Sequence, residues 1–299
     1  LARDRMGKKP LYYYFIEKKV FAFGSEIKPL IKFPEFRKEI RAERISAYLV
    51  NKSFASPDTV FENTYKVEPG QYILWCRGEI HKGQFWNLLE RFEIGNKDLI
   101  EEYGDAKKGL RNLLLDSISK RMMADVPVGA FLSGGIDSTL VTALAKEVSS
   151  KPMQTFTIGF STFEENEAEY AKAVAKYLGT KHTEVYISHG ELLEQIKYLA
   201  TYYDEPFADS SQIPTMLVSK VAKSEVTVAL SGDGGDELFC GYEMYDWMKL
   251  AQDLDGFGTV GYWLCQLPGI NSMRLMERLP DKPYAFLNNR DEKTKIQLF

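Results

Sequence analysis

The stretch Val126-Pro-Val-Gly-Ala-Phe-Leu-Ser-Gly-Gly-Ile-Asp-Ser138 sets the pattern that the central part of the chain follows. Its apolar residues up to Leu132 have the length of a buried parallel strand, and the spacing of apolar residues after Ile136 is helical. Gly134 and Gly135 between them lack a Cβ, so the backbone can approach a ligand closely. The stretch therefore predicts a buried strand, a tight glycine turn and a helix.

Polar groups in this turn are suited to phosphate. The free amides and the positive dipole end of the helix form an anion seat, to which Ser133 and Ser138 add hydroxyl donors. Asp137 adds a carboxylate of the kind that holds magnesium against phosphates. A bare Ser-Gly-Gly turn with an aspartate favoured by the helix dipole is the alternative. The full pattern Ser-Gly-Gly-x-Asp-Ser after a strand favours phosphate, although no Walker loop occurs in the chain.

A second loop repeats this arrangement. The apolar run 226–230 is followed by Ser231-Gly232-Asp-Gly-Gly-Asp-Glu237. Asp233, Asp236 and Glu237 would repel one another and a triphosphate unless a cation lies among them. We therefore expect magnesium to be held jointly by Asp137 and Asp236. A solvated acidic turn at a helix start is the alternative for this loop alone.

Strand and helix alternate around both loops, which predicts a parallel sheet with helices on both faces. Ligands in such sheets bind beyond the carboxyl ends of the strands. The region before it is rich in strands, with the aromatic run at 12–15 packing in a hairpin and a linker at 87–96. We divide the chain into 1–94 and 95–299. The predicted strands cover 11–16, 20–23, 71–76, 79–86, 155–160, 182–187 and 226–230, and one further strand ends at 132. The predicted helices cover 26–33, 41–50, 103–123, 136–149, 167–178, 191–203 and 213–223, with helical patches over 242–279.

Composition excludes several classes of protein. The chain has 299 residues, 44% hydrophobic and 27% charged, and a net charge of -4 without a basic cluster, which argues against a nucleic-acid surface. No apolar run approaches the ~20 residues that span a bilayer. The three widely spaced cysteines make a disulfide framework or zinc site improbable and fit a reducing cytoplasm. We expect Cys76, Cys240 and Cys265 to be small buried apolar residues. The glycine pattern at 256–261 lacks a preceding strand and is better explained as a turn than as a dinucleotide site.

The two loops together resemble a known family. The first is similar to the pyrophosphate loop of the ATP pyrophosphatases, which cleave ATP between the α and β phosphates. Both loops, with Gly241-Tyr242 and the segment Asp204–Ser211, look like the glutamine-hydrolysing asparagine synthetases of bacterial B type. The N-terminal stretches 3–13 and 23–26 look like the last part of that family's glutaminase domain. The resemblance covers nearly the whole chain. It implies a doubly wound ATP pyrophosphatase domain with a helical extension, preceded by a strand-rich remnant of an N-terminal-nucleophile glutaminase domain.

The resemblance also implies a reaction and a set of site residues. Aspartate is adenylated at its β-carboxylate by ATP with magnesium, and ammonia taken from glutamine then gives asparagine and AMP. Asp137 and Asp236 would hold magnesium, and Asp233 would serve the ammonia step, where many relatives have glutamate. The nucleotide would be held by Leu132, Ser133, Gly134, Gly135, Ser138, Ile158, Ser231 and Gly232.

Two parts of the family pattern are not matched. Neither the N-terminal catalytic cysteine of the glutaminase nor the C-terminal helical region with its catalytic lysine is present between Leu1 and Phe299. We therefore expect the chain to bind ATP and magnesium without hydrolysing glutamine or forming asparagine, and we allow for a homodimer. Two alternatives stay open: a related amidotransferase acting on a sugar or β-lactam precursor, and a nucleotide-binding module without turnover.

Overall fold

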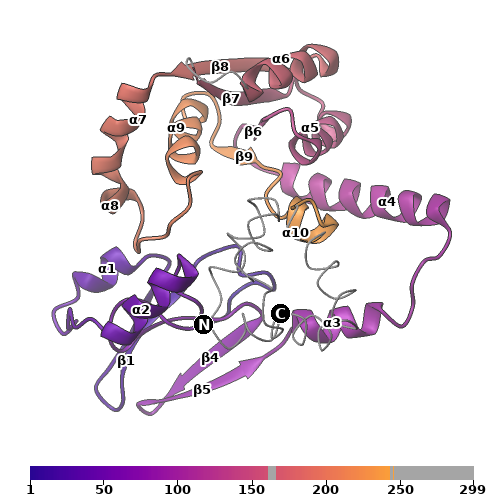
Figure 1. The fold of residues 1–299 in the computed structure, drawn as a ribbon. Coiled ribbons are helices and arrows are strands. Elements are labelled where there is room, and N and C mark those ends of the chain that lie inside the picture. Colours follow the sequence, from indigo (N-terminus) through magenta and orange to yellow (C-terminus); the bar gives the residue numbers. More distant parts are fainter. Residues whose placement is uncertain (161–165, 243–244, 246–299) are drawn as a thin grey trace, which may run out of the picture. The chain divides into compact units, whose positions relative to one another are not determined.

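The structure is a computed structural model, and it describes residues 1–160, 166–242 and 245 (Figure 1). The chain forms two compact units. The first comprises Leu1–Asp125, Ile158–Asn166 and Glu184–Glu225, and the second comprises Val126–Thr157, Glu167–Thr183 and Val226–Phe299. Within the described residues, no helix combines the length and apolar character needed to cross a membrane. The predicted boundary between residues 94 and 95 stays a prediction.

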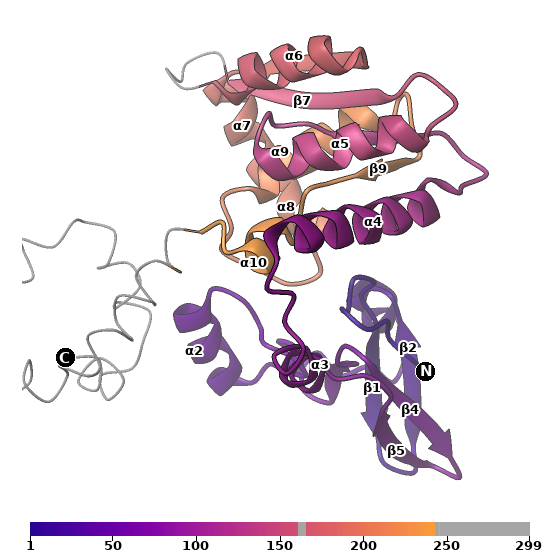
Figure 2. The same ribbon diagram turned by 90° about the vertical axis from the view of Figure 1, so that its right-hand side faces the viewer.

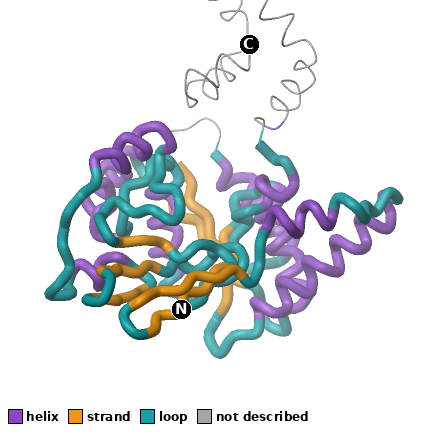
Figure 3. The backbone as a smooth tube through the Cα atoms, turned by 90° about the horizontal axis from the view of Figure 1, so that it is seen from below, coloured by secondary structure: helices purple, strands orange, loops and turns teal. Residues whose placement is uncertain are grey.

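The N-terminal part of the first unit is built on antiparallel strands, drawn in orange in Figure 3. Strands β1 (Tyr12–Ile16) and β2 (Val20–Gly24) form the predicted hairpin, and β3 (Thr64–Lys66) pairs with the other edge of β1. Strands β4 (Gln71–Cys76) and β5 (Glu79–Gln84) form the second predicted hairpin. Both turn residues of this hairpin, Arg77 and Gly78, have positive φ, which matches the twist of the two strands.

Aromatic residues of the first hairpin form the core of this region, as the sequence predicts. Tyr13 is buried with Val67 and Ile73, and its ring stacks on Tyr65 with the centroids 5.4 Å apart. Tyr14 is also fully buried. Because successive side chains of a strand point to opposite faces, β1 buries residues on both of its sides.

Helices complete the first unit, and two predictions about them are wrong. The predicted linker contains α3 (Leu88–Gly95), because the Asn87 side chain caps it by accepting from the amides of Leu89 and Glu90. The predicted helix over 191–203 begins early, at a capping box of Ser188 and Glu191, and is broken by a 3₁₀ turn. The helices are α1 (Ile27–Ile31), α2 (Ala42–Asn51), α3, α4 (Tyr103–Met122), α7 (His189–Gln195), η1 (Ile196–Tyr198), α8 (Leu199–Tyr202) and α9 (Gln212–Ala222).

The predicted parallel sheet is present. Strands β6 (Val128–Phe131), β7 (Gln154–Phe160), β8 (Lys181–Ile187) and β9 (Val228–Leu230) lie in the order β8-β7-β6-β9 (Figure 1). Figure 2 shows β7 and β9 of this sheet in the turned view. β6 pairs in parallel with β7 on one side and with β9 on the other. In this register Ala130 lies beside Leu230, so the carboxyl ends of β6 and β9 are neighbours at one edge of the sheet.

The second unit contains α5 (Ile136–Val148), α6 (Glu167–Leu178) and the short α10 (Gly235–Phe239). α5 packs against β6 and α6. Leu132 at the end of β6 is buried with Ala171 and Ala175 of α6, whose small side chains allow the helix to approach closely. The first loop therefore begins directly after a residue that is fixed by packing against α6.

The prediction that the cysteines are buried is wrong for two of them. Cys76 is the last residue of β4 in a two-stranded sheet, and Cys240 follows α10 with a left-handed backbone, so both are exposed. Cys265, most of the helical patches over 242–279 and the glycine pattern at 256–261 lie outside the described residues.

Candidate functional site

The first glycine loop is ordered by its own serines. The hydroxyl oxygens of Ser133 and Ser138 are 3.0 Å apart, and the Ser133 amide donates to Ser138 Oγ at 3.2 Å. The Gly135 amide donates to Ser133 Oγ at 3.3 Å. The hydroxyls and amides that a phosphate requires thus converge within six residues, where they hydrogen-bond to one another.

Gly134 fixes the position of this loop. Its φ is +84°, and a Cβ there would lie 2.7 Å from the Ala171 amide nitrogen and 2.8 Å from the Tyr170 carbonyl carbon. These are backbone atoms of α6, so they cannot rotate away as a flexible side chain could. The close packing explains why this position of the motif requires glycine.

Thr139 is a polar residue that the sequence analysis did not identify. Its hydroxyl is buried directly after Ser138 and has no hydrogen-bond partner among the described residues. A buried polar group of this kind favours a further partner at the base of the loop. Its position next to the serine motif was the only sequence signal for it.

The second loop is a compact turn that leads into α10. The Gly235 amide donates to the Gly232 carbonyl oxygen at 3.0 Å, and Gly234 has a φ of +91°. The Ser231 hydroxyl donates to Asp233 Oδ2 at 3.0 Å and so orients this exposed carboxylate. The loop thus orients the Asp233 carboxylate through a residue of its own.

The structure brings the two loops into direct contact. A Cβ on Gly232 would lie 2.9 Å from the Ser138 amide nitrogen and 3.0 Å from Asp137 Cβ. A Cβ on Gly235 would lie 2.9 Å from Asp137 Oδ1. Asp137 therefore lies against two glycines of the second loop, and side chains at either position would displace it.

The carboxylates of Asp137 and Asp236 each lie against a glycine of the second loop or of the residues that follow it. The Asp137 carboxylate lies against Gly235, the residue before Asp236, and the Asp236 carboxylate lies against Gly241. No group of three histidine, cysteine or acidic side chains arranged for a metal occurs in residues 1–160, 166–242 and 245. Magnesium commonly takes only one or two carboxylates together with substrate phosphate oxygens, so two carboxylates suffice for this chemistry.

The two apolar residues predicted to contact the nucleotide are placed differently from the loop residues. The Leu132 side chain is 1% exposed under α6, and its amide donates to the Phe156 carbonyl oxygen at 2.9 Å. Ile158 is half-buried in β7 and belongs to the first unit. Leu132 thus supports the loop from behind, and the structure does not group Ile158 with the loop residues.

Tyr242, three residues after α10, allows a testable prediction about pH. The Tyr242 hydroxyl donates to Glu237 Oε1 at 2.9 Å, and this hydrogen bond is the main cause that raises the pKa of Tyr242 to about 12 from 10.0. Since the folded pKa lies above the unfolded one, the contribution to stability is complete below pH 10 and is lost as pH rises through about 12.

Tyrosinate absorbance measures this shift. The difference between the titrations of the native chain and Tyr242→Phe should have its midpoint near 12. Glu237→Gln is a second test: it replaces the carboxylate that accepts the hydrogen bond, so the midpoint should move down toward 10. A midpoint near 10 in the native chain would contradict the hydrogen bond.

Comparison with known families identifies two matches. Residues 109–293 match a family model described as asparagine synthase, and residues 1–86 match one described as a glutamine amidotransferase domain. Both loops lie inside the first of these matches.

Curated relatives give the same result. The chain is 39% identical over 246 residues to "Putative asparagine synthetase [glutamine-hydrolyzing] 2" of Methanocaldococcus jannaschii, which covers 81% of this chain and 46% of that protein. It is 38% identical over 245 residues to "Asparagine synthetase [glutamine-hydrolyzing] 1" of Bacillus subtilis, which covers 82% of this chain and 37% of that protein. The chain therefore spans less than half the length of these relatives.

A solved structure shows a weaker similarity. The NH3-dependent NAD synthetase from Campylobacter jejuni aligns with a TM-score of 0.34 at 16% sequence identity, over 64% of this chain and 95% of that chain.

Proposed function

Because the chain belongs to the asparagine synthase family, we propose that its two glycine loops bind ATP with magnesium for adenylation of the aspartate β-carboxylate. The observation that carries the proposal is the contact of Asp137 with Gly232 and Gly235, which unites two phosphate-suited loops in one site. The names of the curated relatives support this choice of reaction. Glutamine-derived ammonia for the second step is part of the same proposal, and the amidotransferase match supports it.

The first loop would hold the pyrophosphate part of ATP. Amides at Gly134 and Gly135 and hydroxyls of Ser133 and Ser138 would exchange their internal hydrogen bonds for phosphate oxygens. Donors that are already in place lose little freedom on binding, so they align the α-phosphate for attack. The leaving pyrophosphate is stabilised in the same way as it forms.

Magnesium would be held by Asp137 and Asp236. When bound, the ion would neutralise negative charge on the phosphates and so favour attack at the α-phosphorus. The two carboxylates keep their places because glycines at 235 and 241 leave room for them.

The acceptor chemistry follows from these roles. A β-carboxylate oxygen of aspartate attacks the α-phosphorus, and the bond to the bridging oxygen of pyrophosphate breaks. Ammonia then attacks the acyl carbon of β-aspartyl-AMP, loses a proton and releases AMP with asparagine. Asp233 would accept or orient that proton, and its exposed carboxylate beside Ser231 supports the assignment.

The nucleoside would lie beside Ser231 and Gly232. Leu132 and Ile158 remain proposed contacts to the adenine and ribose.

Binding of a fluorescent ATP analogue to this chain tests the proposal. We expect binding that strengthens with magnesium. Asp137→Asn should weaken the magnesium-dependent affinity roughly tenfold or more, since hydrogen bonds and contacts to charged groups contribute about 1.5–3 kcal/mol. Asp116→Asn is the matched control because its side chain is 60% exposed on α4, and it should bind like the native chain.

Equal affinity of Asp137→Asn and the native chain, with and without magnesium, would refute the assignment of Asp137. A second measurement, pyrophosphate release after addition of aspartate, tests the acceptor. Release with another carboxylate only would favour the related amidotransferases, and binding without release would favour a nucleotide-binding module.

A further inference from the structure

Two neighbouring carboxylates outside the glycine loops are buried. Asp204 and Glu205 lie between α8 and α9, in a segment without helix or strand, and their side chains are 10% and 9% exposed. Acidic side chains are almost never buried to this extent unless they are paired. Their partners therefore indicate what the segment does.

Asp204 contacts the start of helix α1. Its Oδ2 accepts from the Ile27 amide at 2.7 Å, and its Oδ1 pairs with Lys28 Nζ at 2.9 Å. The residue preceding the helix, Glu26, makes no side-chain capping bond, and Pro29 in the first turn has no amide hydrogen. Asp204 thus satisfies a helix-start donor that lies 177 positions earlier in the chain.

Glu205 contacts a different element. Its Oε1 accepts from the Val60 amide at 2.9 Å, and its Oε2 pairs with Lys66 Nζ at 3.0 Å. Lys66 also donates to the Phe54 carbonyl oxygen at 2.6 Å. Glu205 therefore connects the segment to the residues before and within β3.

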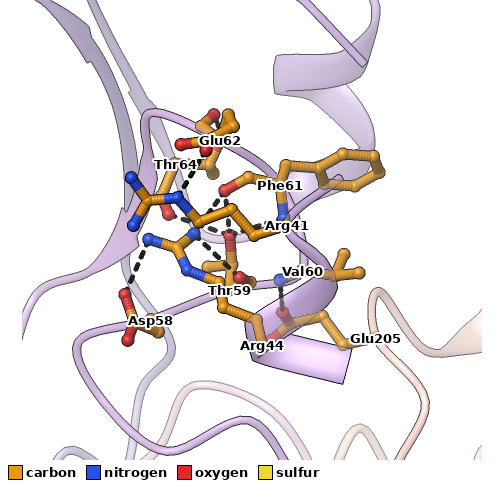
Figure 4. Close-up of polar contacts among 9 residues, drawn as sticks. All are labelled: Arg41, Arg44, Asp58, Thr59, Val60, Phe61, Glu62, Thr64 and Glu205. Atoms are coloured by element: carbon orange, nitrogen blue, oxygen red, sulfur yellow. Dashed lines mark hydrogen bonds and ion pairs between the residues drawn. The ribbon is translucent and has the colours of Figure 1, made fainter. Parts of the chain in front are cut away.

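The loop that presents the Val60 amide is itself held firmly (Figure 4). Arg44 donates to the carbonyl oxygens of Thr59 at 2.9 Å and Phe61 at 2.6 Å, on the two sides of Val60. The Thr59 hydroxyl donates to the Thr64 carbonyl oxygen at 2.9 Å. Glu205 consequently meets an amide of fixed direction.

The contacts of Asp204 and Glu205 lie within the first unit, and each connects a residue of one family match with a residue of the other. Residues 27, 28, 60 and 66 belong to the amidotransferase match, and residues 204 and 205 belong to the asparagine synthase match. We propose that Asp204 and Glu205 form a two-carboxylate clasp that docks the 202–207 segment onto the amidotransferase-matched residues, and that both halves open and close together. This inference goes beyond the proposed activity and does not depend on it.

The clasp acts through the hydrogen bonds that fix its position rather than through a gain in stability from its charges. Burial raises the pKa of Glu205 above its usual value, although Lys66 and the Val60 amide act in the opposite direction. Buried pairs of this kind specify position more reliably than they stabilise.

The charges of Asp204 and Glu205 also affect the pKa of the neighbouring Tyr12 hydroxyl. Burial first, then the charges of Glu205 and Asp204, raises the pKa of Tyr12 to about 12. A cavity of about 360 Å³ lies beside the clasp, and the other charged and titratable residues that line it are Tyr12, Glu26, Lys28, Lys66, Tyr202 and Tyr203.

Hydrogen exchange of two amides tests the clasp in the full chain. Asp204→Ala should speed exchange of the Ile27 amide, and Glu205→Ala that of the Val60 amide, each roughly tenfold for the loss of one such hydrogen bond. Because the two halves act together, each variant should also speed the other amide. Glu205→Gln keeps an acceptor for Val60 and should restore most of its protection.

Controls separate docking from general stability. The Ile73 amide, which donates to the Leu1 carbonyl oxygen at 2.8 Å in the core of the same unit, should keep its rate. Glu17→Ala, an exposed acidic residue with a 3.7 Å pair to Lys18, should change none of the three rates. Unchanged rates at Ile27 and Val60, or equal acceleration at all three amides, would overturn the proposal.

A measurement on the native chain covers the case in which the alanine variants do not fold. With increasing urea, the Ile27 and Val60 amides should show the same opening free energy and the same urea dependence. Independent opening of the two amides would refute a single clasp.

Discussion

Replacing Gly134 by alanine is expected to abolish ATP binding and to lower the free energy of unfolding by about 3 kcal/mol, from a strained left-handed backbone and an overpacked contact together. The backbone at Gly134 has a φ of +84°, and the added Cβ would lie 2.7 Å from the amide nitrogen of Ala171. Relief requires either the loop or α6 to shift. A shift of the loop would separate the hydroxyls of Ser133 and Ser138, now 3.0 Å apart.

Urea denaturation and binding of the fluorescent nucleotide measure the two effects. Gly104→Ala in α4 is the matched control, because within the described part of the chain nothing outside its own helix backbone lies within 4 Å of the added Cβ. In a helix this exchange should stabilise by about 0.5–1 kcal/mol and leave binding unchanged. If Gly134→Ala bound the nucleotide as well as the native chain, the first loop would not be the phosphate site.

Replacing Arg44 by alanine is expected to destabilise the first unit by about 3–5 kcal/mol, as removal of one partner from a buried charged network does. The Arg44 side chain is 6% exposed and pairs with Asp58 Oδ1 at 2.7 Å, in addition to its two bonds to carbonyl oxygens (Figure 4). Its guanidinium carbon also lies 5.5 Å from the centre of the Tyr65 ring. Alanine would remove the Arg44 donor from the Thr59 and Phe61 carbonyl oxygens, of which Phe61 also accepts from the Thr59 hydroxyl at 3.3 Å.

Arg41→Ala is the control for this prediction. Arg41, the residue directly before α2, pairs with Glu62, but its side chain is 48% exposed. Its loss should therefore lower the free energy of unfolding far less than the loss of Arg44. Arg44→Lys should not restore stability, since one ammonium group cannot replace the fork of a guanidinium. Equal unfolding midpoints for Arg44→Ala and Arg41→Ala would contradict the structural role of Arg44.

Local patterns made much of the second unit predictable. The apolar strand before Ser133 and the apolar strand before Ser231 each end in a glycine loop, and parallel pairing then places both loops at one edge of the sheet. The contact of Asp137 with Gly232 and Gly235 follows from this pairing, while the ligand roles of these residues stay predictions. Thr139 could not, since burial of its hydroxyl depends on the packing of α5.

Contacts between distant residues were not predictable in the same way. Strand β3 has three residues, too few for a periodic pattern, and it exists because β1 offers an open edge. The exposure of Cys240 depends on a left-handed turn after α10. The clasp residues Asp204 and Glu205 carry no local sign of their partners, which lie more than a hundred positions earlier.

The capping of α1 by Asp204 has a consequence for the newborn chain. A ribosome completes Ile27 well before Asp204, and 177 residues separate the two. At about 5–20 residues per second, the start of α1 waits roughly 9–35 s and the Val60 amide, 145 positions before Glu205, roughly 7–29 s for their acceptors. The N-terminal region therefore emerges with two binding positions unfilled, and its final form is completed only after the later segment has been translated.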